Sequence, residues 1–232
     1  MARRRVQAAK LGHMEAQRRH HRAAVARVTG GTESPLASAA THALADGVVP
    51  RAVVLVEGIS DQNALEALAE RRGRDLDAEG ISIVPMGGAS TIGRFLDLFG
   101  PQGLDVKLAG LCDVAEVDDF RRGLQRAGLG SSLTLTEMES LGFYVCFSDL
   151  EDELIRSLGV AAVEQVVEAQ GDLRSFRTFQ RQPAQRGRTS QQQLRRFMGT
   201  RSGRKFQYAR LLVDALDLNH VPRPLDGVLA HV

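Results

Sequence analysis

Acidic side chains follow two strongly apolar runs of the sequence, in positions where they could bind a metal ion. Glu57 comes directly after the run 52–56, and Asp61 lies one helical turn later. Asp113 ends a second run, 106–112. Carboxylates gathered at one place repel one another unless a divalent cation neutralises them, and magnesium binds a few carboxylates together with water and phosphate oxygens. The pattern therefore predicts hard-metal chemistry on a phosphate group, although Asp61 is equally suited to a helix N-terminus, where the macrodipole favours a negative charge.

The side chains of other common catalytic mechanisms are missing from the central part of the sequence. All six histidines lie outside residues 50–219. This excludes a core Ser-His-Asp or Cys-His mechanism and a Cys/His zinc cluster there. The sequence has no Gly-x-x-x-x-Gly-Lys-Ser/Thr phosphate loop and no Gly-x-Gly-x-x-Gly after its first apolar run. Cys112 and Cys146 lie in apolar runs, which is typical of small buried side chains in a reducing compartment.

Charge is distributed unevenly along the chain. Residues 1–30 carry eight Lys and Arg against one Glu, residues 31–173 carry ten basic and twenty-four acidic residues, and residues 174–210 carry eleven basic residues and no acidic one. An acidic body suits divalent cations and a cationic segment suits a polyanion such as DNA, unless the two neutralise each other across the fold. No apolar run reaches the roughly 18–20 residues that span a bilayer, and the basic start lacks the apolar core of a secretory signal. We therefore expect a cytoplasmic protein without a membrane segment.

Strands and helices alternate in the middle of the sequence. Continuous apolar, β-branched runs predict buried strands at 52–56, 81–84, 106–112 and 143–147, with helices between them. This order is typical of an α/β fold with a mostly parallel sheet flanked by helices. From residue 150 the pattern becomes helical, at 150–158, 160–170, 172–180, 190–198 and 203–217. We expect a basic extension and linker at 1–35, a short helix at 36–45 that begins an α/β domain over 36–150, and a helical, Arg-rich part over 151–232 that packs on it.

Three segments resemble the Toprim domain: LVEGISD (55–61), PMGG (85–88) and LAGLCD (108–113). That domain is shared by topoisomerases, primases, recombination mediators, ribosomal-RNA maturation nucleases and the nucleases of the OLD (overcoming lysogenization defect) family. The resemblance implies a Rossmann-like sheet over residues 36–150. It also implies that Glu57 takes part in acid–base chemistry or metal binding and that Asp113 holds magnesium.

The likeness is strongest to the OLD branch of the family. Its paired acids match Glu57 and Asp61, and its later acidic helix start matches the segment 149–154, which implies Glu151 and Glu153 as further metal ligands. A lysine in a late basic segment matches Lys205, and the resemblance implies that this residue stabilises charge on the scissile phosphate. Arg204 is the alternative if the register differs by one residue.

The sequence departs from the family pattern in two respects. The Asp-x-Asp of the family is Asp113-Val114-Ala115 here, so the second ligand is Glu116, or Asp118 or Asp119 from the next turn, or is lost. OLD proteins also usually join Toprim to an ATPase domain, and no phosphate loop is present here. We therefore expect a stand-alone Toprim protein, with a separate ATPase as a possible partner.

The expected function is Mg²⁺- or Mn²⁺-dependent endonuclease-type cleavage of DNA phosphodiesters. Arginine matches phosphate oxygens bidentately, so the cationic segment is expected to contact nucleic acid. A non-catalytic module that binds DNA or a partner ATPase, and an RNA-processing nuclease, are the alternatives. Four phenylalanines of the segment lie at helical spacing from other apolar residues and are expected in the core: Phe176, Phe179, Phe197 and Phe206. The residues expected to bind nucleic acid are Arg195, Arg196, Arg201, Arg204 and Lys205.

Overall fold

The structure, a computed structural model, describes residues 49–201 and 203–232. The expected extension at 1–35 and the short helix expected at 36–45 lie outside the described residues. Within the described part, four strands alternate with helices, as the sequence predicts. None of the described helices is long and apolar enough to cross a membrane.

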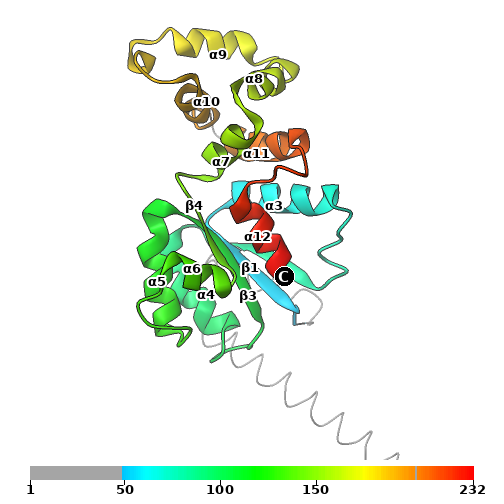
Figure 1. The fold of residues 1–232 in the computed structure, drawn as a ribbon, viewed down its shortest axis with the longest axis vertical. Helices are drawn as coiled ribbons and strands as arrows, with labels where there is room; N and C mark the ends of the chain where they lie inside the picture. The colour runs from blue at the N-terminus through cyan, green and yellow to red at the C-terminus, as the bar shows by residue number, and fades with distance from the viewer. Residues whose placement is uncertain (1–48, 202) are drawn as a thin grey trace, which may run out of the picture.

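The four strands form one parallel sheet in the order β2-β1-β3-β4, which confirms the predicted α/β class (Figure 1). Its strands are β1 (Ala52–Val56), β2 (Ile81–Pro85), β3 (Lys107–Asp113) and β4 (Phe143–Cys146). All five residues of β1 are fully buried because the strand lies inside the sheet and both its faces are covered. The sheet is therefore a rigid base for any residue that follows β1 or β3.

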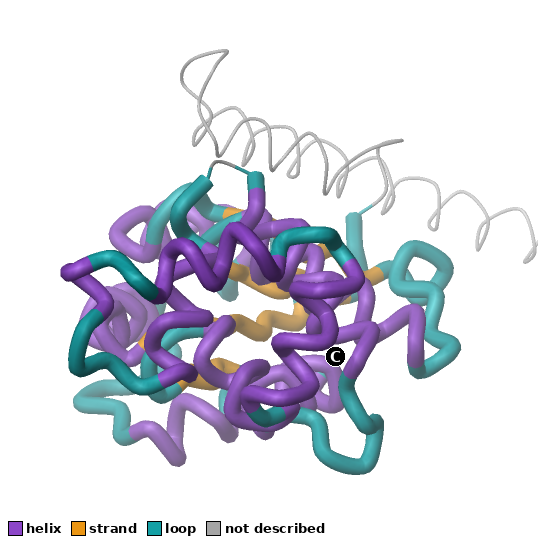
Figure 2. The backbone as a smooth tube through the Cα atoms, turned by 90° about the horizontal axis from the view of Figure 1, so that it is seen from above, coloured by secondary structure: helices purple, strands orange, loops and turns teal. Residues whose placement is uncertain are grey.

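Helices cover both faces of the sheet, as Figures 1 and 2 show. Val53 and Leu55 of β1 pack into one core with three helices, whereas Val54 and Val56 pack into the other core. The first core contains residues of α4 (Ile92–Phe99), α5 (Val117–Arg126) and α6 (Leu135–Ser140). The second contains residues of α3 (Ile59–Arg71) and of the helices that follow β4.

A helical part follows β4, which confirms the predicted C-terminal extension. In Figure 1, α8, α9 and α10 lie beyond one end of the sheet, whereas α11 packs on α3 and α12 returns to β3 and β4. One apolar core runs continuously from the sheet into these helices. The helices are α7 (Leu150–Leu158), α8 (Val160–Ala169), α9 (Leu173–Gln180), α10 (Ser190–Met198), α11 (Arg204–Ala215) and α12 (Arg223–His231).

Two helices were not predicted. Helix α6 has only six residues, and its signal is a capping box in which Thr134 and Glu137 bind each other's main-chain N–H groups. Helix α12 packs so closely on the sheet that a Cβ at Gly227 would lie 2.2 Å from the ring of Tyr144. Glycine at that position is therefore required by the close approach of helix and strand.

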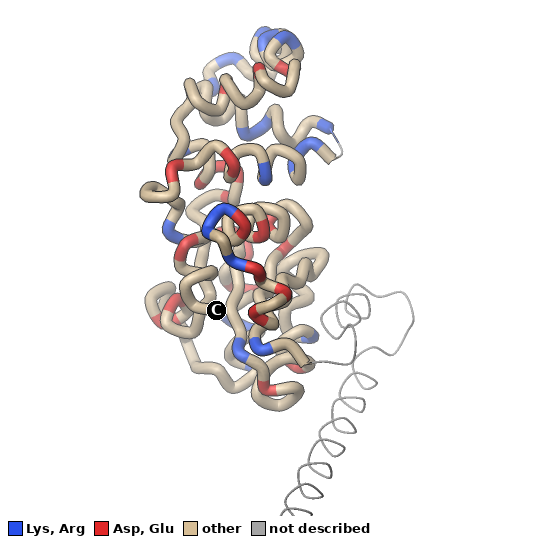
Figure 3. The backbone as a smooth tube through the Cα atoms, turned by 90° about the vertical axis from the view of Figure 1, so that its right-hand side faces the viewer, with Lys and Arg blue, Asp and Glu red and all other residues tan. Residues whose placement is uncertain are grey.

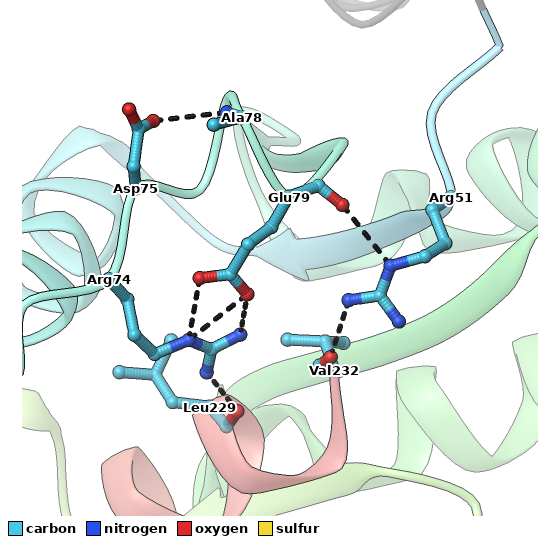
Figure 4. A network of polar contacts seen from close by, with 7 residues as sticks. All are labelled: Arg51, Arg74, Asp75, Ala78, Glu79, Leu229 and Val232. Atoms are coloured by element: carbon cyan, nitrogen blue, oxygen red, sulfur yellow. Dashed lines mark hydrogen bonds and ion pairs between the residues drawn. The ribbon is translucent and has the colours of Figure 1, made fainter.

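A polar network joins the end of α12 to the amino ends of the strands (Figure 4). Arg51, just before β1, donates hydrogen bonds to the main-chain oxygens of Glu79 and Val232 at 3.1 and 2.8 Å. Arg74 pairs with the Glu79 carboxylate at 2.6 Å and donates to the Leu229 carbonyl. The last helix thus closes the amino end of the sheet and leaves the carboxyl end to other groups.

Candidate metal centre

Glu57, Asp113 and Glu116 come together at the carboxyl end of the sheet. Strands β1 and β3 are parallel neighbours in which Val56 pairs with Leu111, so Glu57 and Asp113 leave the sheet at the same end. One carboxylate oxygen from each of the three acidic residues lies within 4.8 Å of the other two. Among the described residues this is the one group of His, Cys, Asp and Glu with such spacing. We call these three residues the carboxylate triad.

The PMGG segment holds the backbone of Glu57. The N–H groups of Gly87 and Gly88 donate to the Glu57 carbonyl at 3.0 and 3.2 Å, and the N–H of Met86 donates to Val56 at 2.8 Å. Gly88 has a φ of 124°, a conformation that residues with a Cβ rarely adopt. The glycines of the motif therefore let the loop after β2 bind the end of β1 and fix the base of the Glu57 side chain.

A short turn brings Glu116 back to Asp113. Residues Val114–Glu116 form a 3₁₀ turn immediately after β3, and Oε2 of Glu116 is buried without a hydrogen-bond partner among the described residues. Asp118 and Asp119 instead pair with arginines of their own helix, at 3.1 and 2.5 Å. Of the three candidates for the second ligand, the structure thus brings Glu116 into the group.

Burial and the neighbouring charges together favour the protonated form of Asp113. Burial, followed by the charges of Asp61, Asp149, Glu57 and Glu116, raises the pKa of Asp113 to about 8. A carboxyl group with that pKa keeps its proton at neutral pH because ionisation would add one more negative charge to the group. A bound cation would remove this cost.

Asp61 serves the helix and faces the acidic group at the same time. Its side chain is 9% exposed, and its Oδ2 accepts a hydrogen bond from the Gly58 N–H at 2.9 Å at the start of α3. Burial raises the pKa of Asp61 to about 6; the Gly58 N–H and Lys205 lower it, and Glu57 and Asp149 raise it further. Asp61 thus makes the contact expected at a helix N-terminus, and it lies in the field of the acidic group although outside the carboxylate triad.

Lys205 and Glu151 form an ion pair beside this group. Glu151 is 1% exposed, and its Oε2 lies 3.2 Å from Nζ of Lys205. Burial raises the pKa of Glu151 to about 7, against the lowering effect of Lys205. Burial lowers the pKa of Lys205, but the charges of Glu151, Asp61 and Asp149 outweigh that effect and hold it above its ordinary value. The amine is therefore charged and faces the acidic end of the sheet.

Glu153 and Arg195 are engaged in contacts of their own. Oε1 of Glu153 accepts a hydrogen bond from the Phe147 N–H at 2.8 Å, and its Oε2 pairs with Arg156. Nε of Arg195 lies 2.6 Å from Asp149. Both residues thus hold the loop between β4 and α7 against neighbouring helices.

The remaining residues expected to bind nucleic acid differ in exposure. Arg196 and Arg201 are exposed, whereas Arg204 is buried and pairs with Asp172 at 3.2 Å. The expectation that four phenylalanines of this segment are buried is wrong for Phe206, which is 47% exposed at the start of α11. The other described elements leave about half of Phe206 uncovered, a fact that its spacing in the sequence does not reveal.

Asp149 is an acidic residue that the sequence did not single out as a site residue. It follows β4 and caps α7, where its Oδ1 accepts the Asp152 N–H at 2.8 Å. Its charge contributes to the raised pKa values of Asp61 and Asp113. The sequence contained a signal for this residue, since Asp149 comes after a predicted strand of the parallel sheet, as Glu57 and Asp113 do.

Comparison with known proteins agrees with the motifs. Residues 50–114 match the model of the overcoming lysogenization defect protein-like Toprim domain. The C-terminal region of the OLD protein of Xanthomonas campestris pv. campestris is similar in structure, with a TM-score of 0.59 and 24% identity over 78% of this chain and 94% of that one.

The C-terminal region of the Burkholderia pseudomallei OLD protein has a TM-score of 0.58 and 23% identity, over 79% and 97% of the two chains. These likenesses show a shared fold. No curated protein matches the chain. The motifs, the parallel sheet and the family model thus agree that residues 50–114 are similar to the Toprim domain of OLD-like proteins.

Proposed function

We propose that this protein is a Mg²⁺- or Mn²⁺-dependent, endonuclease-type phosphodiesterase that cleaves DNA. The OLD-like Toprim domain supports a nuclease-type module. The observation that carries the proposal is the carboxylate triad, whose oxygens lie within 4.8 Å of one another at the carboxyl end of a parallel sheet. In open α/β sheets this end is the usual place for a ligand.

The donor set fits a hard divalent cation. All three groups of the carboxylate triad offer oxygen, Oε2 of Glu116 is buried without a donor among the described residues, and the pKa of Asp113 is raised to about 8. This shift arises from burial and from the neighbouring carboxylates, and a divalent cation would offset both by stabilising the ionised carboxyl group. We assign Glu57, Asp113 and Glu116 to one ion. Asp61 and Glu151 would bind a second ion at a neighbouring position.

The residues around the triad have distinct roles in this proposal. Magnesium or manganese bound there would polarise a phosphate oxygen as a Lewis acid. Lys205, held by Glu151, places its charged amine where negative charge grows on the scissile phosphate. Glu57, besides binding the ion, would accept the proton of the attacking water. Glu153, whose oxygens are already bonded, would hold the end of β4 and not a metal.

Plasmid cleavage tests the proposal. Purified protein with Mn²⁺ should convert supercoiled plasmid to nicked and linear forms, and Glu57→Gln or Asp113→Asn should slow this by roughly 100-fold or more. Matched controls are Asp97→Asn and Glu168→Gln, which remove a charge from exposed positions outside the site. Cleavage that survives both site substitutions would remove these carboxylates from the reaction.

Two other outcomes would assign a different function. Retention of plasmid without cleavage at any Mn²⁺ concentration would indicate a non-catalytic module that binds DNA or a partner ATPase. Faster cleavage of an RNA than of a DNA with the same sequence would indicate an RNA-processing nuclease.

A further inference from the structure

A basic pocket lies in the helical part of the chain, separate from the carboxylate triad. It has a volume of about 570 Å³ and lies between α9, the end of α10 and the start of α11. Figure 3 shows Lys and Arg residues over these upper helices. The lining contains no Asp or Glu, and it contains three arginines, Arg174, Arg201 and Arg204.

One wall of the pocket is built around Arg204. Its Nη1 donates to Oγ1 of Thr200 at 2.9 Å and to the carbonyl of Phe197 at 3.3 Å, and its Nη2 pairs with Asp172 at 3.2 Å. The guanidinium group also lies 4.1 Å from the centre of the Phe197 ring, within the range of a cation–π contact. Tyr208 donates to the other Asp172 oxygen at 3.1 Å. Because these contacts fix Arg204 and neutralise its charge, it supports the pocket and leaves the binding charge to its neighbours.

The other two arginines have no charge partner among the described residues. Arg174 and Arg201 are exposed, and their side chains make no ion pair or hydrogen bond with that part of the protein. Other arginines of the segment do pair, as Arg177 does with Glu164 at 2.6 Å and Arg195 does with Asp149. The pocket thus concentrates two uncompensated positive charges in a segment whose cations are otherwise often neutralised.

The remaining lining suits a phosphate with an attached organic group. Ser175 lines the pocket beside the two arginines and Phe179 adds an apolar surface, whereas the hydroxyls of Thr178 and Thr200 already donate to the carbonyls of Arg174 and Phe197. Guanidinium and hydroxyl groups donate to phosphate oxygens, and aromatic carbon contacts a sugar or base. A cavity of this size lies within the range of pockets for small organic ligands, roughly 300–1,000 Å³.

Helix α11 connects this pocket to the carboxylate triad. Arg204 lines the pocket and the next residue, Lys205, contacts Glu151 beside the triad. Consecutive residues of a helix point about 100° apart, so the start of this one helix contributes a residue to each site.

We propose that this pocket binds the phosphate backbone of the same nucleic-acid strand whose scissile bond lies at the carboxylate triad. The proposal rests on the proposed function, since it assigns the pocket to the same substrate. It predicts that Arg174 and Arg201 increase affinity without regard to sequence, and that short substrates bind weakly because they cannot reach both sites.

Binding in the absence of metal tests the pocket independently of cleavage. The anisotropy of a fluorescent single-stranded 20-mer is measured in EDTA over a series of salt concentrations, for the wild type and for Arg174→Ala/Arg201→Ala. At low salt we expect the dissociation constant to rise by roughly 30- to 100-fold. The slope of log affinity against log salt should fall by about 1.4, which is about 0.7 for each lost phosphate contact on a single strand.

Arg181→Ala/Arg186→Ala is the matched control. It removes the same charge from exposed positions of the same region that do not line the pocket, and it should change affinity less than about threefold. Equal losses in the two double variants would overturn the proposal, because they would show that diffuse charge and not the pocket binds DNA.

Competition with a mononucleotide tests whether the pocket binds the phosphate of a strand or that of a free nucleotide. Thymidine monophosphate at 1 mM should displace little of the bound 20-mer. Binding of thymidine monophosphate as tight as that of the strand, and lost in Arg174→Ala/Arg201→Ala, would overturn the strand assignment in favour of a free nucleotide. Normal strand binding together with absent plasmid cleavage would overturn the proposed nuclease function and leave the pocket standing.

Discussion

Cation binding at the carboxylate triad should release a proton at neutral pH. Burial and four neighbouring carboxylates raise the pKa of Asp113 to about 8, and only the ionised group is a metal ligand. A group with that pKa carries about 0.9 proton at pH 7 and about 0.1 at pH 9. Binding of Mn²⁺ should therefore release about 0.9 proton at pH 7 and almost none at pH 9.

Because the proton and Mn²⁺ compete for Asp113, the affinity for Mn²⁺ also depends on pH. The dissociation constant for Mn²⁺ should fall about ninefold from pH 6 to 7 and about fivefold from pH 7 to 8, and then level off as the carboxyl group becomes fully ionised. Asp61 and Glu151, with pKa values of about 6 and 7, would steepen the lower part of the curve if they also bind an ion. Isothermal titration calorimetry in two buffers with different heats of protonation counts the protons directly.

Thermal unfolding provides an independent measure of the same binding. At 100 times its dissociation constant, Mn²⁺ should add about 2.7 kcal/mol to the free energy of unfolding. For a chain of this size that corresponds to a rise in Tm of roughly 5–10 °C. Asp97→Asn should behave as the wild type, whereas Asp113→Asn should lose most of the effect. Tight Mn²⁺ binding at pH 7 with release of fewer than about 0.3 proton would refute the reasoning about Asp113.

Three other results are expected. Without metal, the free energy of unfolding should decrease as pH rises from about 4 to 8, because Asp113 binds its proton more tightly in the folded state; a denaturant series that shows a constant or rising value would contradict this. Glu116→Gln should weaken Mn²⁺ binding at least tenfold whereas Asp118→Asn should not, and calorimetry that shows the reverse order would place the second ligand on α5. Gly227→Ala should cost about 1–3 kcal/mol because its Cβ would meet the Tyr144 ring, whereas Gly199→Ala, at an open position with a φ of −83°, should cost less than about 1 kcal/mol by urea unfolding.

The strands of the fold were predictable because their signal is local. A run of β-branched and aliphatic residues such as Ala52–Val56 is stable only where both faces are covered, and all five of its residues are fully buried. Helix α6 was missed because it is short. Helix α12 has a local signal that the prediction left out, a proline in its first turn followed by Leu225, Val228 and Leu229 at helical spacing. No periodicity within residues 223–231 reveals that Gly227 lies against Tyr144.

Some residues of the site could likewise be predicted from the sequence, and others could not. Glu57 and Asp113 could be nominated because each follows a buried strand of a predicted parallel sheet, and the register of β1 and β3 places them at one end. The choice between Glu116 and its neighbours depends on the 3₁₀ turn after β3, whose direction no residue type specifies. The ion pair of Lys205 with Glu151 joins two helices distant in sequence, so only the resemblance to a family indicated it.

The position of a bound ion tests the central claim most directly. Crystals soaked in Mn²⁺ at pH 8 or above should give an anomalous peak in contact with one carboxylate oxygen each of Glu57, Asp113 and Glu116. A saturating soak that leaves these three side chains without a peak, or that places the ion on other residues, would contradict the account.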